Sequence, residues 1–185
     1  MKKLFILAMF GLIVSCKAQT YPLRTYTKIP ENAYVKDTNN ELNSYTGTWK
    51  ATWNNKNIYI TFKKMTNTYN TNLKYYKDFL IGKFKVEGEG GKVLFDNTNI
   101  ADDKAKIKGG GFKKIDGKYL FGYIDMDLCG ISGFITINFT DSTKTKLQWN
   151  YSKDNDWTDS DCFYWGKPAS ERPDPLPFNI IFTKL

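Results

Sequence analysis

The sequence predicts an all-β protein, a single antiparallel up-and-down barrel of about eight or nine strands, and three observations support this prediction. Aromatic residues make up 16 % of the chain, and such side chains fit the pleated, half-buried surface of a strand. From residue 47 onwards, apolar and polar residues alternate with a period of two, as in a strand with one dry face. These segments recur at intervals of roughly a dozen residues with turn-forming residues between them. The alternative architecture is a β-sandwich or a half-open barrel.

The predicted strands follow one another with short connections. They span residues 47–53, 58–63, 76–87, 92–96, 106–114, 119–125, 131–139, 144–152 and 178–185. Residues 66–72 are predicted to form a polar loop, and three consecutive glycines at 109–111 indicate a bulge or sharp bend. Asp116-Gly117 indicates a hairpin with a type I′ turn, in which both central residues have positive φ. Because the connections are short, we expect consecutive strands to pair antiparallel and the sheet to close on itself.

The N-terminal segment is predicted to direct the chain out of the cytoplasm. A basic start precedes an apolar run over residues 4–14 that is too short to span a bilayer. We therefore expect residues 1–15 to be a signal peptide. The run ends in Ile13-Val14-Ser15-Cys16, which resembles the bacterial lipobox and implies that Cys16 is lipidated. The alternative is ordinary cleavage slightly further on, with Cys16 removed.

Lipidation would hold the protein on a membrane, because a lipidated N-terminal cysteine exceeds the two lipid signals that lasting attachment needs. Lys17 follows the cysteine, and by resemblance to lipoprotein sorting this implies the outer membrane, on its periplasmic leaflet or at the cell surface. Residues 16–43 contain two prolines and little periodicity, so they are predicted to be a tether. Within it, residues 37–42 are expected to cap a short helical turn. The barrel domain is expected over residues 44–185.

Composition argues against several classes of function. The formal net charge is +8, but scattered lysines without a recognition helix do not indicate a nucleic-acid partner. The chain has no histidine, which excludes Ser-His and Cys-His nucleophile arrangements and the usual general base. A hydrolase built on two carboxylates would have to use Asp125 and Asp127, the only compact pair outside one acidic loop. We therefore expect a protein that is not an enzyme and that carries no cofactor.

Two cysteines follow Cys16, namely Cys129 and Cys162. Beyond the inner membrane the environment is oxidising, so these two are expected to form a disulfide. By the loop-entropy model it would contribute roughly 3–4 kcal/mol. It would also fix the long irregular stretch over residues 153–177 to the turn around Cys129. The alternative is a pair of unpaired buried thiols.

The irregular stretch over residues 153–177 holds the remaining candidate site residues. Its acidic members are Asp154, Asp156, Asp159 and Asp161, and its aromatic members are Trp157, Phe163, Tyr164 and Trp165. The aspartates are a weak calcium candidate, because the spacing, glycine and terminal glutamate of an EF-hand are missing. Exposed aromatic rings would suit stacking on a sugar or contact with a protein, whereas rings folded over the barrel mouth would form a lid. The lid is the favoured reading.

Gly47-Thr48-Trp49 resembles the Gly-x-Trp entry of lipocalin-like barrels. In those proteins the tryptophan closes one barrel end beneath an arginine near the end of the last strand. This chain departs from that pattern, because its only arginines are Arg24 and Arg172. Lys184 can supply a cation over the Trp49 ring instead. The alternative is that Trp49 is a plain core aromatic residue.

A wider resemblance covers most of the chain. It rests on residues 15–23, 29–34 and 36–42, on Tyr45-x-Gly47-Thr48-Trp49 and on the Thr183-Lys184 ending. This combination resembles an uncharacterised family of small flavobacterial (Bacteroidota) lipoproteins, a domain of unknown function. The resemblance implies the cellular address and supplies no activity.

Together these features predict a non-enzymatic, lipid-anchored envelope protein that serves as an interaction or structural module. Its partners would be the membrane, through the lipid on Cys16, and an envelope protein or polysaccharide that meets the 153–177 stretch. The alternative is a lipocalin-like barrel that binds a small apolar or amphipathic ligand in its interior. The two readings differ in whether large side chains fill the barrel. The aromatic residues expected to point inward and favour a filled interior are Phe84, Phe95, Phe121, Phe134 and Trp149.

Overall fold

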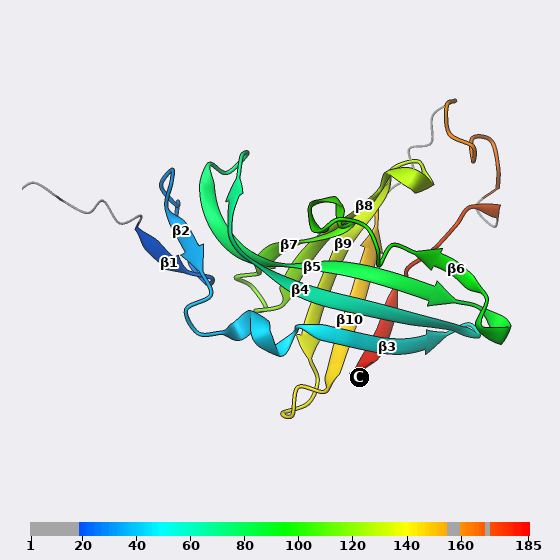
Figure 1. The fold of residues 1–185 in the computed structure, drawn as a ribbon, viewed down its shortest axis with the longest axis horizontal. Helices are drawn as coiled ribbons and strands as arrows, with labels where there is room; N and C mark the ends of the chain where they lie inside the picture. The colour runs from blue at the N-terminus through cyan, green and yellow to red at the C-terminus, as the bar shows by residue number, and fades with distance from the viewer. Residues whose placement is uncertain (1–18, 155–159, 169–170) are drawn as a thin grey trace, which may run out of the picture.

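A computed structural model describes residues 19–154, 160–168 and 171–185. These residues form a closed antiparallel barrel of eight strands with three additional strands, and they contain no α-helix (Figure 1). The strands are β1 (Thr20–Pro22), β2 (Tyr34–Lys36), β3 (Gly47–Trp53), β4 (Lys56–Asn70), β5 (Tyr75–Glu87), β6 (Val93–Asp96), β7 (Ile107–Phe112), β8 (Tyr119–Asp125), β9 (Ile131–Phe139), β10 (Lys146–Lys153) and β11 (Asn179–Lys184). Four short 3₁₀ turns are η1 (Glu41–Ser44), η2 (Glu89–Gly91), η3 (Asp102–Lys104) and η4 (Met126–Leu128). The predicted fold class is confirmed.

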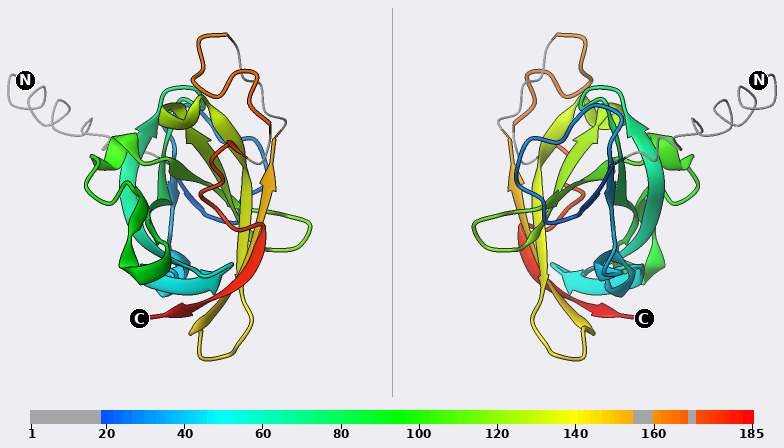
Figure 2. Two further views of the ribbon diagram at one scale, coloured as in Figure 1. Left: turned by 90° about the vertical axis from the view of Figure 1, so that its right-hand side faces the viewer. Right: turned by 90° about the vertical axis from the view of Figure 1, so that its left-hand side faces the viewer.

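The barrel closes at two places. Around the sheet the strands run β5-β4-β3-β11-β10-β9-β8-β7, and β7 pairs back onto β5 (Figure 2). The last and first barrel strands of the chain, β11 and β3, pair through Thr183 with Lys50 and Lys184 with Trp49. The β5 and β7 strands pair over two positions, with Lys108 opposite Ile81. Closure pairs the edges that an open sheet would leave exposed.

Large side chains fill the barrel interior. The largest buried ones are Trp49, Trp149, Tyr119, Tyr123, Phe62, Phe84, Phe121 and Phe182. Neighbouring rings contact one another across the interior, as in the stacked pair of Phe62 and Phe121 with centroids 5.1 Å apart. Such ring pairs add to the free energy gained from burial. The inward positions predicted for Phe84, Phe121 and Trp149 are therefore confirmed.

Two of the predicted inward aromatic residues lie elsewhere. Phe134 is 54 % exposed on the outer face of β9, because its neighbours Gly133 and Ile135 occupy the inward positions of that alternating strand. Phe95 lies on β6, which pairs only with β5 and stands outside the barrel wall. It is half-buried and packs against the core from there.

Several predicted boundaries differ from the structure. Residues 66–70, expected in a polar loop, continue β4 and pair with β5 beyond an irregularity between Met65 and Thr68. The rings of Tyr69 and Tyr76 meet across this pair with centroids 5.0 Å apart, which is a stabilising cross-strand contact. Residues 20–22 and 34–36, expected within a tether, form the parallel strands β1 and β2, and β2 pairs with β5. The predicted helical turn is present as η1.

The Asp116-Gly117 hairpin joins β7 to β8, but its turn type differs from the prediction. Gly117 has a φ of 68° and is the residue of this pair with positive φ, so the turn is not type I′. The connection is longer than two residues and is held by the bond from Lys113 N to the Lys118 carbonyl. The Asp116 carboxylate also accepts a hydrogen bond from Lys118 N. These two hydrogen bonds, one between backbone groups and one to a side chain, stabilise a wider loop.

The glycine run in β7 is a bulge, as predicted, with a register shift between Gly109 and Gly111. Gly109 lies on β7 next to the positions that pair with β5, and it faces the Leu80 backbone. A Cβ atom at Gly109 would lie 2.3 Å from the Tyr119 hydroxyl oxygen and 2.7 Å from the Leu80 carbonyl oxygen. The absence of a side chain at Gly109 therefore permits the β5 and β7 strands to meet.

We predict that Gly109→Ala destabilises the protein, because the added methyl group overlaps the Tyr119 hydroxyl and the Leu80 backbone. The free energy of unfolding should fall by about 1–3 kcal/mol, as measured by urea denaturation. Gly110→Ala is the matched control, since its nearest neighbour would be the Leu120 carbonyl at an ordinary 3.5 Å. Equal unfolding midpoints for the two variants would contradict this account of the closure.

Candidate functional site

The predicted disulfide is present and joins the long β10–β11 connection to the barrel. It links Cys129, directly after η4, to Cys162, and their Cα atoms are 5.6 Å apart. Cys162 itself is nearly buried. The segment that follows, Cys162–Lys167, is called the aromatic loop below. The disulfide therefore fixes one end of the aromatic loop to the β8–β9 turn.

The aromatic loop presents two rings to solvent. Phe163 is 75 % exposed and Trp165 is 57 % exposed, so the predicted lid over the barrel mouth is wrong for these residues. Tyr164 is half-buried, and its ring meets Phe163 edge-on with centroids 5.1 Å apart. The Lys167 ammonium lies 4.0 Å from the centre of the Phe163 ring, a favourable cation–π distance. Trp157 lies outside the described residues.

The predicted calcium candidate is covered only in part. Asp156 and Asp159 lie outside the described residues, whereas Asp154 accepts a hydrogen bond from the Ser132 hydroxyl and Asp161 has contacts of its own. Within the described ranges, no group of three or more His, Cys, Asp or Glu residues is placed to hold a metal ion.

At the opposite barrel end, Trp49 and Lys184 lie as the sequence suggests. Trp49 is fully buried and donates from its indole nitrogen to the Tyr45 carbonyl at 2.8 Å. The Lys184 ammonium lies 5.2 Å from the centre of the Trp49 ring and donates to the Ser44 carbonyl. These contacts tie η1 and the end of β11 to the core. Trp49 is therefore a core residue in this structure.

The Asp125 and Asp127 carboxylates share one cation. Lys106 donates to Asp125 at 2.5 Å and to Asp127 at 2.7 Å. Burial lowers the pKa of Lys106, the hydrogen bonds to the two carboxylates raise it, and the net shift is upward. The hydrogen bond from Lys106 lowers the pKa of Asp127. Asp125 is buried and also accepts from the Tyr123 hydroxyl, so Lys106 offsets part of the negative charge of this structural cluster.

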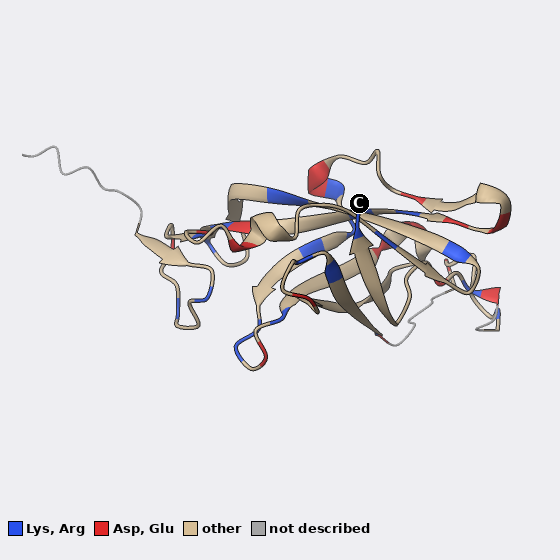
Figure 3. Cartoon of the chain, turned by 90° about the horizontal axis from the view of Figure 1, so that it is seen from below, with Lys and Arg blue, Asp and Glu red and all other residues tan. Residues whose placement is uncertain are grey.

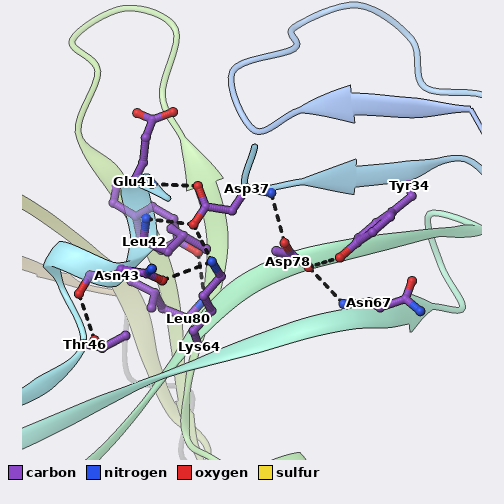
Figure 4. A network of polar contacts seen from close by, with 11 residues as sticks. Tyr34, Asp37, Glu41, Leu42, Asn43, Thr46, Lys64, Asn67, Asp78 and Leu80 are labelled. Atoms are coloured by element: carbon purple, nitrogen blue, oxygen red, sulfur yellow. Dashed lines mark hydrogen bonds and ion pairs between the residues drawn. The ribbon is translucent and has the colours of Figure 1, made fainter. Parts of the chain in front are cut away.

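A second buried cluster joins the N-terminal segment to the barrel, and the sequence alone did not indicate it (Figure 4). We call this cluster of Tyr34, Asp37, Lys64 and Asp78 the N-terminal clamp. The Asp78 carboxylate accepts from the Tyr34 hydroxyl at 2.6 Å, from Asp37 N at 2.9 Å and from Asn67 N at 2.9 Å. Burial first, and the hydrogen bond to Asp78 second, raise the pKa of Tyr34 to about 12.

The other carboxylate of the clamp holds the 3₁₀ turn. Asp37 lies three residues before Asn40, the N-cap residue of η1, and its carboxylate accepts from Glu41 N at 2.7 Å and from Leu42 N at 3.1 Å. Lys64 donates to Asp37 at 2.6 Å, and the Asp37 side chain is fully buried. Each charge of the clamp thus has hydrogen-bonded partners, which a buried charge requires.

Charged residues elsewhere are interspersed rather than gathered on one face. Lysines and arginines are distributed over strands and loops, with acidic residues among them (Figure 3). No helix in the described ranges combines the length and the apolar character needed to cross a bilayer.

The fold and these contacts define a small filled β-barrel that carries a disulfide-fixed aromatic loop and a clamped N-terminal segment. Sequence comparison identifies the family of the chain, because the model of a family of unknown function, DUF6705, matches residues 1–185. The chain belongs to that family. No curated protein and no solved structure matched it.

We predict that Asp78→Asn loosens the N-terminal clamp, because the amide replaces one acceptor oxygen by a donor that faces N–H and O–H groups. The free energy of unfolding should fall by about 1–3 kcal/mol, and amide hydrogen exchange should accelerate over β1 and β2. Asp96→Asn is the control, since Asp96 is exposed and its carboxylate accepts from the neighbouring Thr98. Equal free energies of unfolding and equal exchange rates over β1 and β2 in the two variants would contradict the role assigned to the clamp.

Proposed function

We propose that this protein is a non-enzymatic, lipid-anchored protein of the cell envelope that uses the aromatic loop to contact an envelope protein or polysaccharide. The observation that supports the proposal most strongly is the exposure of Phe163 and Trp165 on a loop fixed by a disulfide. Large exposed aromatic side chains are enriched where proteins bind partners. Fixing the loop in advance reduces the entropy lost on binding.

The placement of the loop fits an anchored protein. β1 lies at one end of the long axis of the molecule, and the aromatic loop lies at the other (Figure 1). The first strand begins at Thr20, four residues after the proposed lipidated Cys16, which is a span of at most about 14 Å. A lipid on Cys16 would therefore hold the barrel close to the outer membrane, with the loop directed away from the attachment point.

The filled interior favours this proposal over a ligand inside the barrel. The inward-facing rings of Phe84, Phe121 and Trp149 are buried among other large side chains. A lipocalin-like pocket for an apolar ligand needs several small inward residues in their place. The proposed contact surface therefore lies on the outside of the barrel.

In living cells, a photoreactive benzoylphenylalanine in place of Phe163 or Trp165 should form a discrete cross-linked product on irradiation. The reason is that an exposed ring at either position would lie against the partner. The measurement is gel mobility followed by mass spectrometry of the product. The control is the same group at Ile115, which is 87 % exposed in the distant β7–β8 hairpin. Identical products at all three positions, or none, would argue against a contact at the loop.

The anchor is tested in the same cells with Cys16→Ala. Membrane fractionation should move the protein from the membrane to the soluble fraction, because the residue that carries the lipid is gone. Continued membrane association of this variant would contradict the anchor without deciding the role of the loop.

A further inference from the structure

An open pocket of about 350 Å³ lies on the outside of the barrel, beside the β4–β5 hairpin. It is lined by hairpin residues 68–72, by Lys77 and Phe79 of β5, and by Lys108 and Gly109 of β7. We call it the hairpin pocket. None of these lining residues is acidic. The hairpin bends away from the barrel beyond β7, at the end of the molecule opposite to the aromatic loop (Figure 1).

Lys77 brings a half-buried positive charge to this pocket, and it has no carboxylate partner within residues 19–154, 160–168 and 171–185. Its ammonium donates to the carbonyl oxygens of Gly109 at 3.1 Å and Gly110 at 3.4 Å. An ammonium has three donor hydrogens, so one remains without an acceptor in the part of the chain that the structure describes. Burial lowers the pKa of Lys77, and its ammonium also lies 5.2 Å from the centre of the Phe79 ring.

Three other poorly exposed lysines of the barrel form ion pairs with carboxylates. The side chains of Lys64, Lys83 and Lys106 are 17 %, 18 % and 16 % exposed, and each lies within 2.8 Å of a carboxylate oxygen. Burying a charge costs free energy unless it is paired. In the described ranges Lys77 has no carboxylate partner, as is also true of the half-buried Lys50, Lys56, Lys167 and Lys184. Lys77 in addition lines this open pocket.

The remaining walls supply a second cation and neutral groups. Lys108 is exposed, and its ammonium donates to the Asp103 carbonyl at 2.7 Å, which leaves further donor hydrogens for a ligand. Thr68 and Thr71 contribute hydroxyl groups, and Tyr69 and Phe79 contribute aromatic rings. Two ammonium groups favour an anion, while hydroxyl groups and rings suit the polar and apolar faces of a sugar.

We propose that the hairpin pocket binds an anionic saccharide, with its acidic group against Lys77 and Lys108 and its sugar ring against the hairpin wall. A volume of about 350 Å³ is at the small end of ligand pockets and holds one or two sugar units. The lysines recognise the negative charge itself, whether it is a carboxylate, a sulfate or a phosphate. This site is separate from the aromatic loop, so either proposal can fail alone.

Isothermal titration calorimetry on the full chain tests the proposal with trigalacturonate, a sulfated disaccharide and glucose 6-phosphate. Maltotriose serves as the neutral probe and inorganic phosphate as the anion without a sugar. At least one anionic saccharide should bind with a Kd of about 1 mM or tighter. Its affinity should fall with added salt, and it should exceed the affinity for both reference compounds about tenfold. The probe that binds most tightly identifies the acidic group.

Lys77→Met should weaken this binding about tenfold or more, because a charged hydrogen-bond donor is lost. Lys108→Met should weaken it as well, and since Lys108 is exposed this variant decides the matter if Lys77→Met fails to fold. Lys92→Met, at an exposed lysine in the η2–β6 turn, should change affinity less than about twofold.

Three results would overturn the proposal. The first is an absence of heat from every anionic saccharide at about 10 mM. The second is equal affinity in Lys108→Met and Lys92→Met. The third is equal or tighter binding of maltotriose or inorganic phosphate.

Discussion

One edge of β5 is the constraint on which the rest of the structure depends. One edge of β5 pairs with β4 along its length. The opposite edge, which is the constraint, pairs successively with β2, β7 and β6. The pairing of β5 with β7 closes the barrel over two positions. It requires Gly109 to approach the Leu80 carbonyl and the Tyr119 hydroxyl closely. Between the β2 and β7 pairings, Leu80 N donates to the Tyr119 hydroxyl at 3.0 Å. A side chain thereby replaces a strand partner where the strands separate.

Because side chains alternate along β5, the adjacent residues Lys77 and Asp78 have different surroundings. Successive residues of a strand point to opposite faces. Asp78 points to the inner side, where it binds the N-terminal segment, and Lys77 faces the hairpin pocket on the outer side. Two adjacent residues with opposite charges therefore do not pair with each other. The N-terminal clamp satisfies Asp78, whereas the Lys77 ammonium contacts the Gly109 and Gly110 carbonyl oxygens and the Phe79 ring.

The sequence predicted what depends on local pattern and missed what depends on long-range contacts. Period-two alternation located every barrel strand, because it reflects burial of one face of each strand. The predicted inward position of Phe134 was wrong because the same alternation requires Phe134 to point outward when Gly133 and Ile135 point inward. The parallel pairing of β2 with β5 left no local pattern, because its three residues alternate too briefly. The alternation places Asp78 on the inner face with Leu80 and Phe84, but no local pattern indicated which groups would satisfy its buried carboxylate.

The candidate sites also comprise features that the sequence predicted and features that depend on long-range contacts. Cys129 and Cys162 were predictable as a pair because only two cysteines remained, and the exposed rings near them followed from composition. Whether those rings cover the barrel or face solvent depended on the path of the loop, which no local pattern specifies. The missing counter-ion of Lys77 is a property of its surroundings in three dimensions.

The central claim is that side chains fill this barrel, so that any partner or ligand binds outside it. Xenon enters dry apolar cavities in protein crystals, so a crystal structure determined under xenon pressure measures the interior directly. The account predicts no xenon among the inward rings of Phe84, Phe121 and Trp149. A xenon atom bound there would contradict it and would return the interior to consideration as a ligand site.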